Sequence, residues 1–192
     1  MSEIKTFKHR NYEVINMINL HDFLLCRKNK YFHLKTFDNI DDFKKEINEY
    51  KTKTKYGIYV PKMLKTSKRE LSILFEYVGE ETIDSLLAKG DIDEKIFDKL
   101  FIIYRFARFS HIELNYYPEN FAYYNGELYY LLYEFSKENK DKNLENYGIR
   151  FWFSGEEGLS HLKELGYSVD NSRLLSKGEL NKKIVLLSIM KW

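Results

Sequence analysis

The N-terminal part of the chain, up to Val78, alternates apolar and polar residues at the spacing typical of β-strands. The alternation is most regular in the run YFHLKTF, and charged or polar turns separate the runs. The strand-like runs are Tyr12–Ile18, Phe23–Cys26, Tyr31–Phe37, Lys62–Lys65 and Leu71–Val78. We therefore predict a sheet of short strands in this part.

Helical spacing appears at four places. Asp38–Lys53 begins with several aspartates, which suit the first turn of a helix, and its apolar residues recur on one face. Asp91–Phe109 carries a continuous apolar stripe, which is typical of a buried helix. Shorter helices are predicted over Glu156–Leu165 and Lys177–Trp192.

A hairpin is predicted after the long helix. Phe121–Tyr124 and Leu128–Tyr133 are aromatic and aliphatic runs of strand character. Asn125-Gly126 lies between them, and this dipeptide readily adopts the positive φ angles of a tight hairpin turn.

A polar loop with His111, Glu113 and Asn120 joins the long helix to the hairpin. This order resembles the catalytic core of the protein-kinase-like superfamily, where H-R-D-x-x-x-x-N precedes a hairpin and a metal-binding aspartate. Glu113 stands where the family has aspartate, and Asn120 lies two residues further from His111 than in the family. The resemblance implies that Glu113 is the catalytic base, that Asn120 binds metal and that His111 is structural.

The position of the metal-binding aspartate has two readings. The end of the hairpin is similar to "LYYIDYE" in small bacterial kinase-like proteins, which places Leu132 at the aspartate position. A register shifted by two residues places Glu134 there instead, as a second metal ligand. With Leu132, one oxygen ligand for Mg²⁺ is lost.

Two stretches upstream extend the resemblance. The strand YFHLKTF is similar to V-A-I-K, whose lysine pairs with nucleotide phosphates, and Lys35 matches that lysine. By itself, a strand lysine is more often a solvated edge residue. The following FKKEINEY is similar to "REIEAY" in small kinase-like phosphotransferases, so Glu46, with Glu49 as second choice, is expected to hold Lys35.

The stretch SILFEYVGEETIDSLL resembles the connection between the two lobes of kinase-like proteins. Glu76, Tyr77 and Val78 match the hinge, whose backbone contacts adenine. A strand, a glycine turn and a helix also occur together in many unrelated α+β folds. The position of this stretch, between the lysine helix and the histidine loop, supports the resemblance.

The turn at Asn19–Phe23 departs from the family. Kinases have glycines here, because backbone amides must approach phosphate oxygens closely. The first glycine of this chain is Gly57, and Asp22 is expected to repel a phosphate at this turn. ATP binding is therefore expected to be weakened.

Composition excludes several classes of protein. The 192 residues include 31 basic and 29 acidic side chains, for a net charge of +2, which gives no preference for nucleic acid. The N-terminus lacks the apolar stretch of a secretion signal, and no apolar run is as long as a membrane span. A single cysteine, Cys26, cannot form an internal disulfide. We expect a cytoplasmic protein.

Together these features predict an α+β chain with a minimal two-lobed protein-kinase-like fold. Residues 1–78 would form an N-lobe of antiparallel strands with one helix. Residues 79–192 would form a reduced helical C-lobe containing the 121–133 hairpin. The order of the motifs, spread over residues 31–135, carries more weight than any single motif.

The resemblance implies an ATP-dependent phosphotransferase that uses Mg²⁺ or Mn²⁺ and a hydroxyl acceptor on a protein or a small molecule. The alternative is a catalytically impaired pseudokinase that acts as a nucleotide- or protein-binding module. A third reading is a small interaction domain that binds no nucleotide. The oxygen atoms of Glu113 and Glu134 lie one methylene further out than those of aspartate, and displacements of this size cost about 100-fold in rate.

Overall fold

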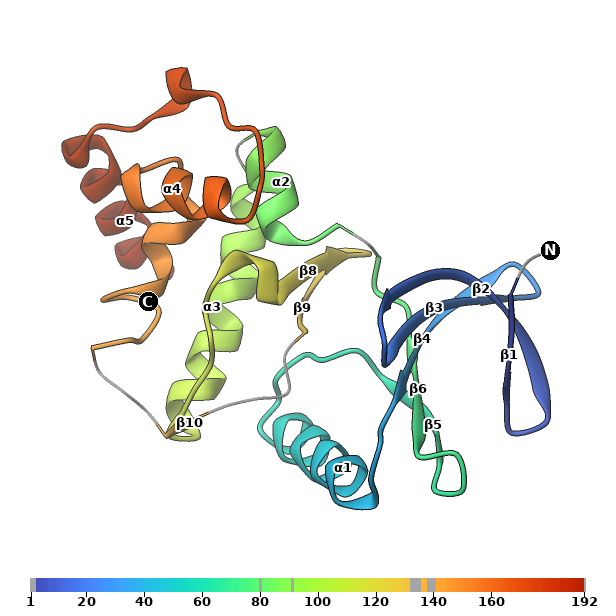
Figure 1. The fold of residues 1–192 in the computed structure, drawn as a ribbon. Coiled ribbons are helices and arrows are strands. Elements are labelled where there is room, and N and C mark those ends of the chain that lie inside the picture. The colour runs from blue at the N-terminus through green and yellow to red at the C-terminus, as the bar shows by residue number, and fades with distance from the viewer. Residues whose placement is uncertain (1–2, 80, 91, 132–135, 138–140, 192) are drawn as a thin grey trace. The chain divides into compact units, whose positions relative to one another are not determined.

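The computed structural model describes residues 3–79, 81–90, 92–131, 136–137 and 141–191. In this part the chain is mixed α+β, with a curled antiparallel sheet and five α-helices (Figure 1). It divides into two compact units. The first contains Met1–Lys53 and Val60–Val78, and the second contains Thr54–Tyr59 and Gly79–Trp192.

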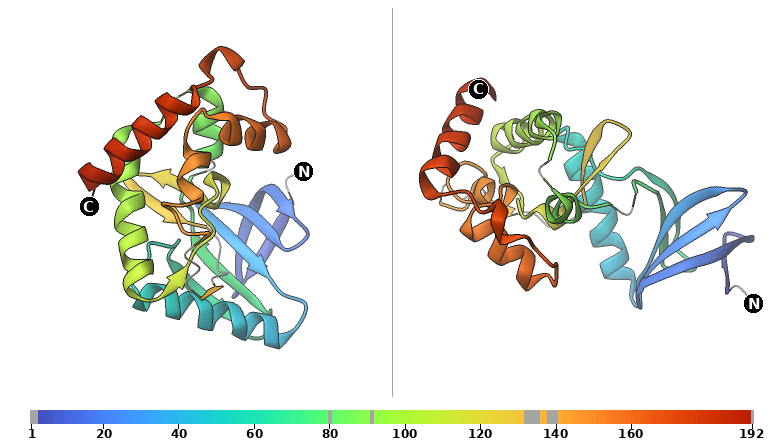
Figure 2. Two further views of the ribbon diagram at one scale, coloured as in Figure 1. Left: turned by 90° about the vertical axis from the view of Figure 1, so that its left-hand side faces the viewer. Right: turned by 90° about the horizontal axis from the view of Figure 1, so that it is seen from above.

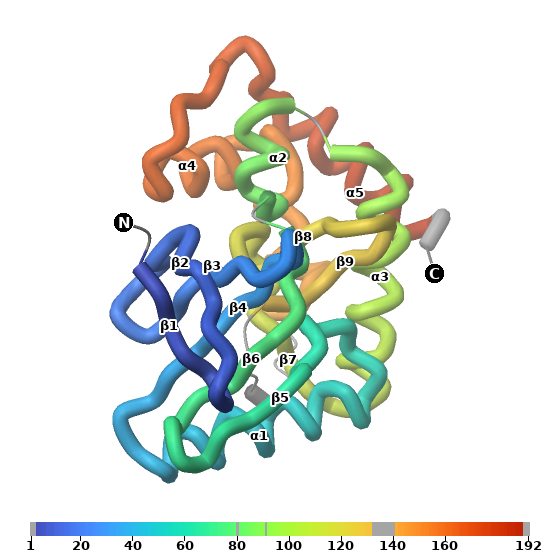
Figure 3. Tube along the Cα trace, turned by 90° about the vertical axis from the view of Figure 1, so that its right-hand side faces the viewer, coloured from blue at the N-terminus to red at the C-terminus, as the bar shows by residue number. Residues whose placement is uncertain are grey.

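The described part of the first unit contains a six-stranded antiparallel sheet in the order β1-β2-β3-β4-β6-β5 (Figure 3). The connection from β4 to β5 contains helix α1 (Ile40–Lys55). The neighbour of β4 in the sheet is β6 and not β5. The strands are β1 (Ile4–Phe7), β2 (Arg10–Asn19), β3 (Asp22–Arg27), β4 (Lys30–Thr36), β5 (Met63–Ser67) and β6 (Ser72–Glu76).

The two faces of this sheet are covered differently. On one face, side chains from five strands form a closed apolar cluster of Phe7, Tyr12, Phe23, Leu25, Leu34 and Leu74. Helix α1 covers the opposite face, where the ring of Tyr50 lies 6.3 Å from the ring of Phe75 between centroids, a spacing typical of aromatic pairs. Alternation along β4 places Leu34 in the cluster and Lys35 on the α1 face.

The second unit is built around helix α3 (Glu94–Phe109) and the hairpin of β8 (Phe121–Tyr124) and β9 (Glu127–Tyr130). Its other α-helices are α2 (Ile83–Lys89), α4 (Glu156–Glu164) and α5 (Lys177–Lys191). The short elements are β7 (Ile112–Glu113), paired with β10 (Ser136–Lys137), and the 3-10 turns η1 (Pro118–Asn120), η2 (Gly148–Trp152) and η3 (Asn171–Arg173). The turn η2 contacts both α4 and α5 (Figure 2).

Within the described residues the predicted elements are present with shifted ends, while the last residues of the second predicted hairpin strand, 132 and 133, lie outside them. The hairpin turn is confirmed, because Asn125 and Gly126 have φ angles of 51° and 82°. Helix α3 begins at Glu94 and not at Asp91, because the Asp93 side chain accepts a hydrogen bond from the Lys95 backbone and caps the helix. Likewise, α1 begins at Ile40, where the Asn39 side chain accepts from two backbone amides.

Strands β1, β7 and β10 were not predicted. Strand β1 lies along β2, and the two-residue strands β7 and β10 pair across a long sequence separation. All three strands are too short to show a clear period of apolar residues. Among the described residues, no helix is long and apolar enough to cross a membrane.

Candidate functional site

Lys35 and Glu46 form an ion pair inside the first unit. Lys35 Nζ lies 2.9 Å from Glu46 Oε1, which joins β4 to α1. Both side chains are largely shielded, with 28% and 10% of their surface exposed. Limited exposure reduces the screening of their attraction by water.

The helix geometry decides between Glu46 and Glu49 as the partner of Lys35. Glu46 is buried on the sheet side of α1 together with Phe43. Glu49 lies 3.8 Å from Lys45, one turn away along the helix surface. Residues three apart on a helix differ by only about 60° in direction, but it is Glu46 that contacts Lys35.

A second carboxylate lies beside Lys35. Asp22 is the cross-strand partner of Lys35 in the β3–β4 ladder, so both side chains leave the same face of the sheet. Asp22 Oδ1 lies 3.1 Å from His33 Nε2, and Asp22 Oδ2 accepts a hydrogen bond from Asn19 at 2.7 Å. The sequence did not reveal the contact with His33, although the two-residue spacing of His33 and Lys35 places them on one face.

Several forces act on the ionisation of Asp22. Burial opposes the charged form, but the contacts from His33 and Asn19 and the charge of Lys35 outweigh it. The pKa of the Asp22 carboxyl is therefore lowered from its ordinary value of 3.8. At neutral pH the Asp22 carboxyl is therefore ionised, and its charge acts on Lys35 from the neighbouring strand.

The hinge residues lie at the end of β6. Glu76 accepts a hydrogen bond from the Lys62 backbone through Oε1 at 2.7 Å, and its own amide donates to the Lys62 carbonyl at 2.9 Å. Tyr77 contacts the ring of Tyr31 at a centroid distance of 5.6 Å, and Val78 is buried. These contacts tie the segment to β5 and to the β3–β4 hairpin.

The loop with Glu113 and Asn120 is in the second unit. Glu113 is buried in β7, opposite Ser136 of β10. Asn120 ends η1, is also buried and donates from Nδ2 to the Asn115 carbonyl at 3.3 Å. The loop therefore folds back on itself between the two predicted site residues. His111 is exposed and adopts a left-handed φ of 55° directly after α3.

The surroundings of Glu113 are rich in tyrosine. Burial, followed by the charge of Glu113, raises the pKa of Tyr116 well above its ordinary value. Burial and a hydrogen bond to Glu145 raise the pKa of Tyr104 as well, and its ring meets that of Tyr116 edge to face at 5.7 Å. Both phenols therefore stay protonated over the physiological range.

An aromatic core supports this loop from behind. Trp152 is fully buried and donates its indole N–H to the Tyr116 carbonyl at 2.7 Å. Gly148 lies against Tyr116 so closely that a Cβ there would be 2.5 Å from the Tyr116 Cβ. The stretch Asn143–Phe153 thus packs behind the loop.

The two readings of the metal position, Leu132 and Glu134, fall outside the described residues. Among the residues that are described, no group of three or more histidine, cysteine, aspartate or glutamate side chains is arranged to hold a metal ion.

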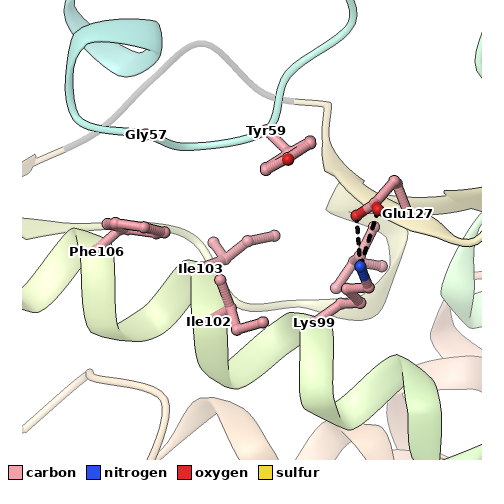
Figure 4. Close-up of a pocket in the computed structure, with 8 residues that line it drawn as sticks. Gly57, Tyr59, Lys99, Ile102, Ile103, Phe106 and Glu127 are labelled. Carbon is pink, nitrogen blue, oxygen red and sulfur yellow. Dashed lines mark hydrogen bonds and ion pairs between the residues drawn. The ribbon is translucent and has the colours of Figure 1, made fainter.

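The second unit also has a pocket of about 320 Å³ beside α3 (Figure 4). Ile102, Ile103 and Phe106 form its apolar side, and Tyr59 lies across from them. At one end, Lys99 Nζ binds both carboxylate oxygens of Glu127 at 2.8 Å. The polar groups of this pocket bind each other, so it offers no charge that a ligand would meet unpaired.

A comparison of the sequence with models of known protein families and with curated proteins finds no match.

Proposed function

We propose that this chain is a small protein-kinase-like protein that binds ATP and transfers its terminal phosphoryl group, with Mg²⁺, to a hydroxyl acceptor. The observation that carries the proposal is the ion pair between Lys35 and Glu46, at 2.9 Å. In protein kinases, a strand lysine held by a glutamate of the following helix binds the nucleotide phosphates.

The arrangement of elements around this pair supports the proposal. The lysine strand β4 leads into the glutamate helix α1 and pairs with β6, the strand that ends in Glu76. In the second unit, the long helix α3 leads into the loop with Glu113 and Asn120, and the hairpin follows. This is the element order that the resemblance requires.

The proposal assigns a role to each site residue. Lys35, positioned by Glu46, binds the phosphates, and the backbone of Glu76, Tyr77 and Val78 contacts the adenine. Glu113 orients the acceptor hydroxyl. Asn120 and Glu134 bind Mg²⁺ or Mn²⁺ through oxygen atoms, the ligands that such hard cations prefer. The acceptor is a protein or a small molecule, and the proposed setting is the cytoplasm.

One observation favours a second candidate, a catalytically impaired pseudokinase that binds nucleotide or protein. The ionised Asp22 stands next to Lys35, at the turn where a kinase has glycines. A fixed negative charge there weakens binding of a triphosphate and disturbs its placement. The two candidates differ in turnover and in dependence on metal.

Thermal unfolding of the full chain with ATP, with and without Mg²⁺ or Mn²⁺, tests the proposal. A ligand at a hundredfold excess over its dissociation constant stabilises the native state by about 2.7 kcal/mol. Lys35→Ala removes the phosphate contact. Lys30→Ala, at the exposed start of the same strand, is the matched control. Glu134→Ala removes the proposed metal ligand.

The outcomes separate the candidates. A metal-dependent shift lost in Lys35→Ala and Glu134→Ala but kept in Lys30→Ala supports the phosphotransferase. A shift that needs no metal supports the pseudokinase. No shift with saturating ATP contradicts both nucleotide-binding candidates.

A further inference from the structure

A second acidic side chain, Asp22, lies near Lys35 besides Glu46. Asp22 and Lys35 are directly paired residues of neighbouring antiparallel strands. The Cβ atoms of such pairs are about 5 Å apart and point to the same side of the sheet. The side chain of Asp22 is mostly shielded, with 18% of its surface exposed, so its charge is only partly screened.

The position of Asp22 is held by contacts on two sides. Asn19 donates to one carboxylate oxygen at 2.7 Å, and His33 Nε2 lies 3.1 Å from the other. Asn19 also accepts a hydrogen bond from the His21 amide at 2.8 Å, which closes the β2–β3 turn. The carboxylate therefore cannot swing away from Lys35 without breaking these contacts.

The turn itself is fastened to the end of β4. The Thr36 amide and hydroxyl both donate to the His21 carbonyl, at 2.8 and 3.2 Å. His21 Nε2 lies 3.4 Å from Asp38 Oδ2, just before α1. A turn with this many contacts keeps one conformation, whereas a loop that admits a phosphate group must let its backbone amides approach the oxygens.

We propose that Asp22 is an internal competitor for the ligand of Lys35, and that it determines which anions the site accepts. Its carboxylate provides Lys35 with the negative partner that a phosphate group would otherwise provide. A free polyphosphate must bind against this charge, while a phosphate that carries a divalent cation meets less repulsion. The identity of the ligand in this inference rests on the proposed function. The position of Asp22 beside Lys35 does not depend on it.

Isothermal titration of the full chain with inorganic tripolyphosphate, and separately with ATP and Mg²⁺, tests the inference. Asp22→Asn keeps the shape of the side chain and removes its charge. Asp41→Asn, on the exposed first turn of α1, changes the net charge equally and is the matched control. Asp22→Ser is the second variant, in case the first does not fold.

Removing the Asp22 charge beside Lys35 is expected to tighten tripolyphosphate binding roughly tenfold, and less at high salt. Asp41→Asn is expected to change the affinity for tripolyphosphate by less than about twofold, because the charge of Asp41 is exposed and screened. Equal effects of the two variants, or no effect of Asp22→Asn and Asp22→Ser, would overturn the inference.

The two ligands distinguish the inference from the proposed function. If Asp22→Asn gains affinity for tripolyphosphate while ATP does not bind, the inference holds and the nucleotide function fails. If ATP binds the wild type and Asp22→Asn equally, the function stands and the inference fails. If neither ligand binds any variant, both are contradicted.

Discussion

The indole N–H of Trp152 donates to the backbone carbonyl of Tyr116 at 2.7 Å, across 36 residues of sequence. This bond connects the turn η2 to the loop that lies between Glu113 and Asn120. Trp152 and Tyr116 are both buried, so water does not compete for this hydrogen bond in the folded state. The loop with the proposed site residues is thus held by a distant aromatic segment.

Trp152→Phe is expected to destabilise the protein by about 1–3 kcal/mol, because the substitution leaves the buried Tyr116 carbonyl without this donor while it keeps an aromatic ring. Urea unfolding followed by circular dichroism measures the effect. Tyr31→Phe, at the exposed start of β4, is the control and is expected to change little. An unfolding midpoint for Trp152→Phe equal to that of the wild type would show that the bond contributes nothing.

Gly148→Ala is expected to destabilise the second unit by about 1–3 kcal/mol. The new Cβ would lie 2.5 Å from the Tyr116 Cβ, so the loop or η2 must move. Gly178→Ala in α5 is the matched control, because no atom lies within 4 Å of a Cβ there. Thermal unfolding of the Gly148→Ala and Gly178→Ala variants tests this prediction. Equal melting temperatures of the two variants would contradict the close contact at Gly148.

Glu46→Gln is expected to cost about 1–3 kcal/mol, because Lys35 loses a charged hydrogen-bond partner in a largely shielded site. Glu49→Gln is expected to change the free energy of unfolding by less than about 0.5 kcal/mol, because its pair with Lys45 is long and near the surface. Denaturant unfolding measures the free energy of unfolding of each variant. Similar losses of stability in both variants would argue against a special role of Glu46.

The contribution of Asp22 to stability is expected to depend on pH. Its pKa is lowered in the folded state, so the unfolded chain binds the proton more readily. The stabilisation is therefore present above the ordinary pKa of 3.8 and is lost as the pH falls through the lower folded value.

Unfolding of the wild type and of Asp22→Asn between pH 7 and pH 2 measures this effect. The difference in stability between them is expected to be constant near neutrality and to shrink below about pH 4. A difference that stays the same down to pH 2 would contradict the lowered pKa.

Local sequence features were enough to place most elements of the chain. Helix α1 and the hairpin turn follow from short-range rules, because capping side chains and positive φ angles depend on neighbouring residues. The ends shifted by a few residues where Asn39 or Asp93 took the capping role. Strand β1 was missed because a four-residue segment has no clear period.

The candidate site was only partly predictable. The sequence by itself determined that Lys35 lies in a strand and that two glutamates follow in a helix. The resemblance made Glu46 the first choice as its partner, and the tertiary structure confirmed that choice. Only the tertiary structure placed Asp22 and His33 beside this pair. The physical reason is that strand register and helix rotation depend on burial of apolar side chains far apart in the sequence, which no local pattern of residues encodes.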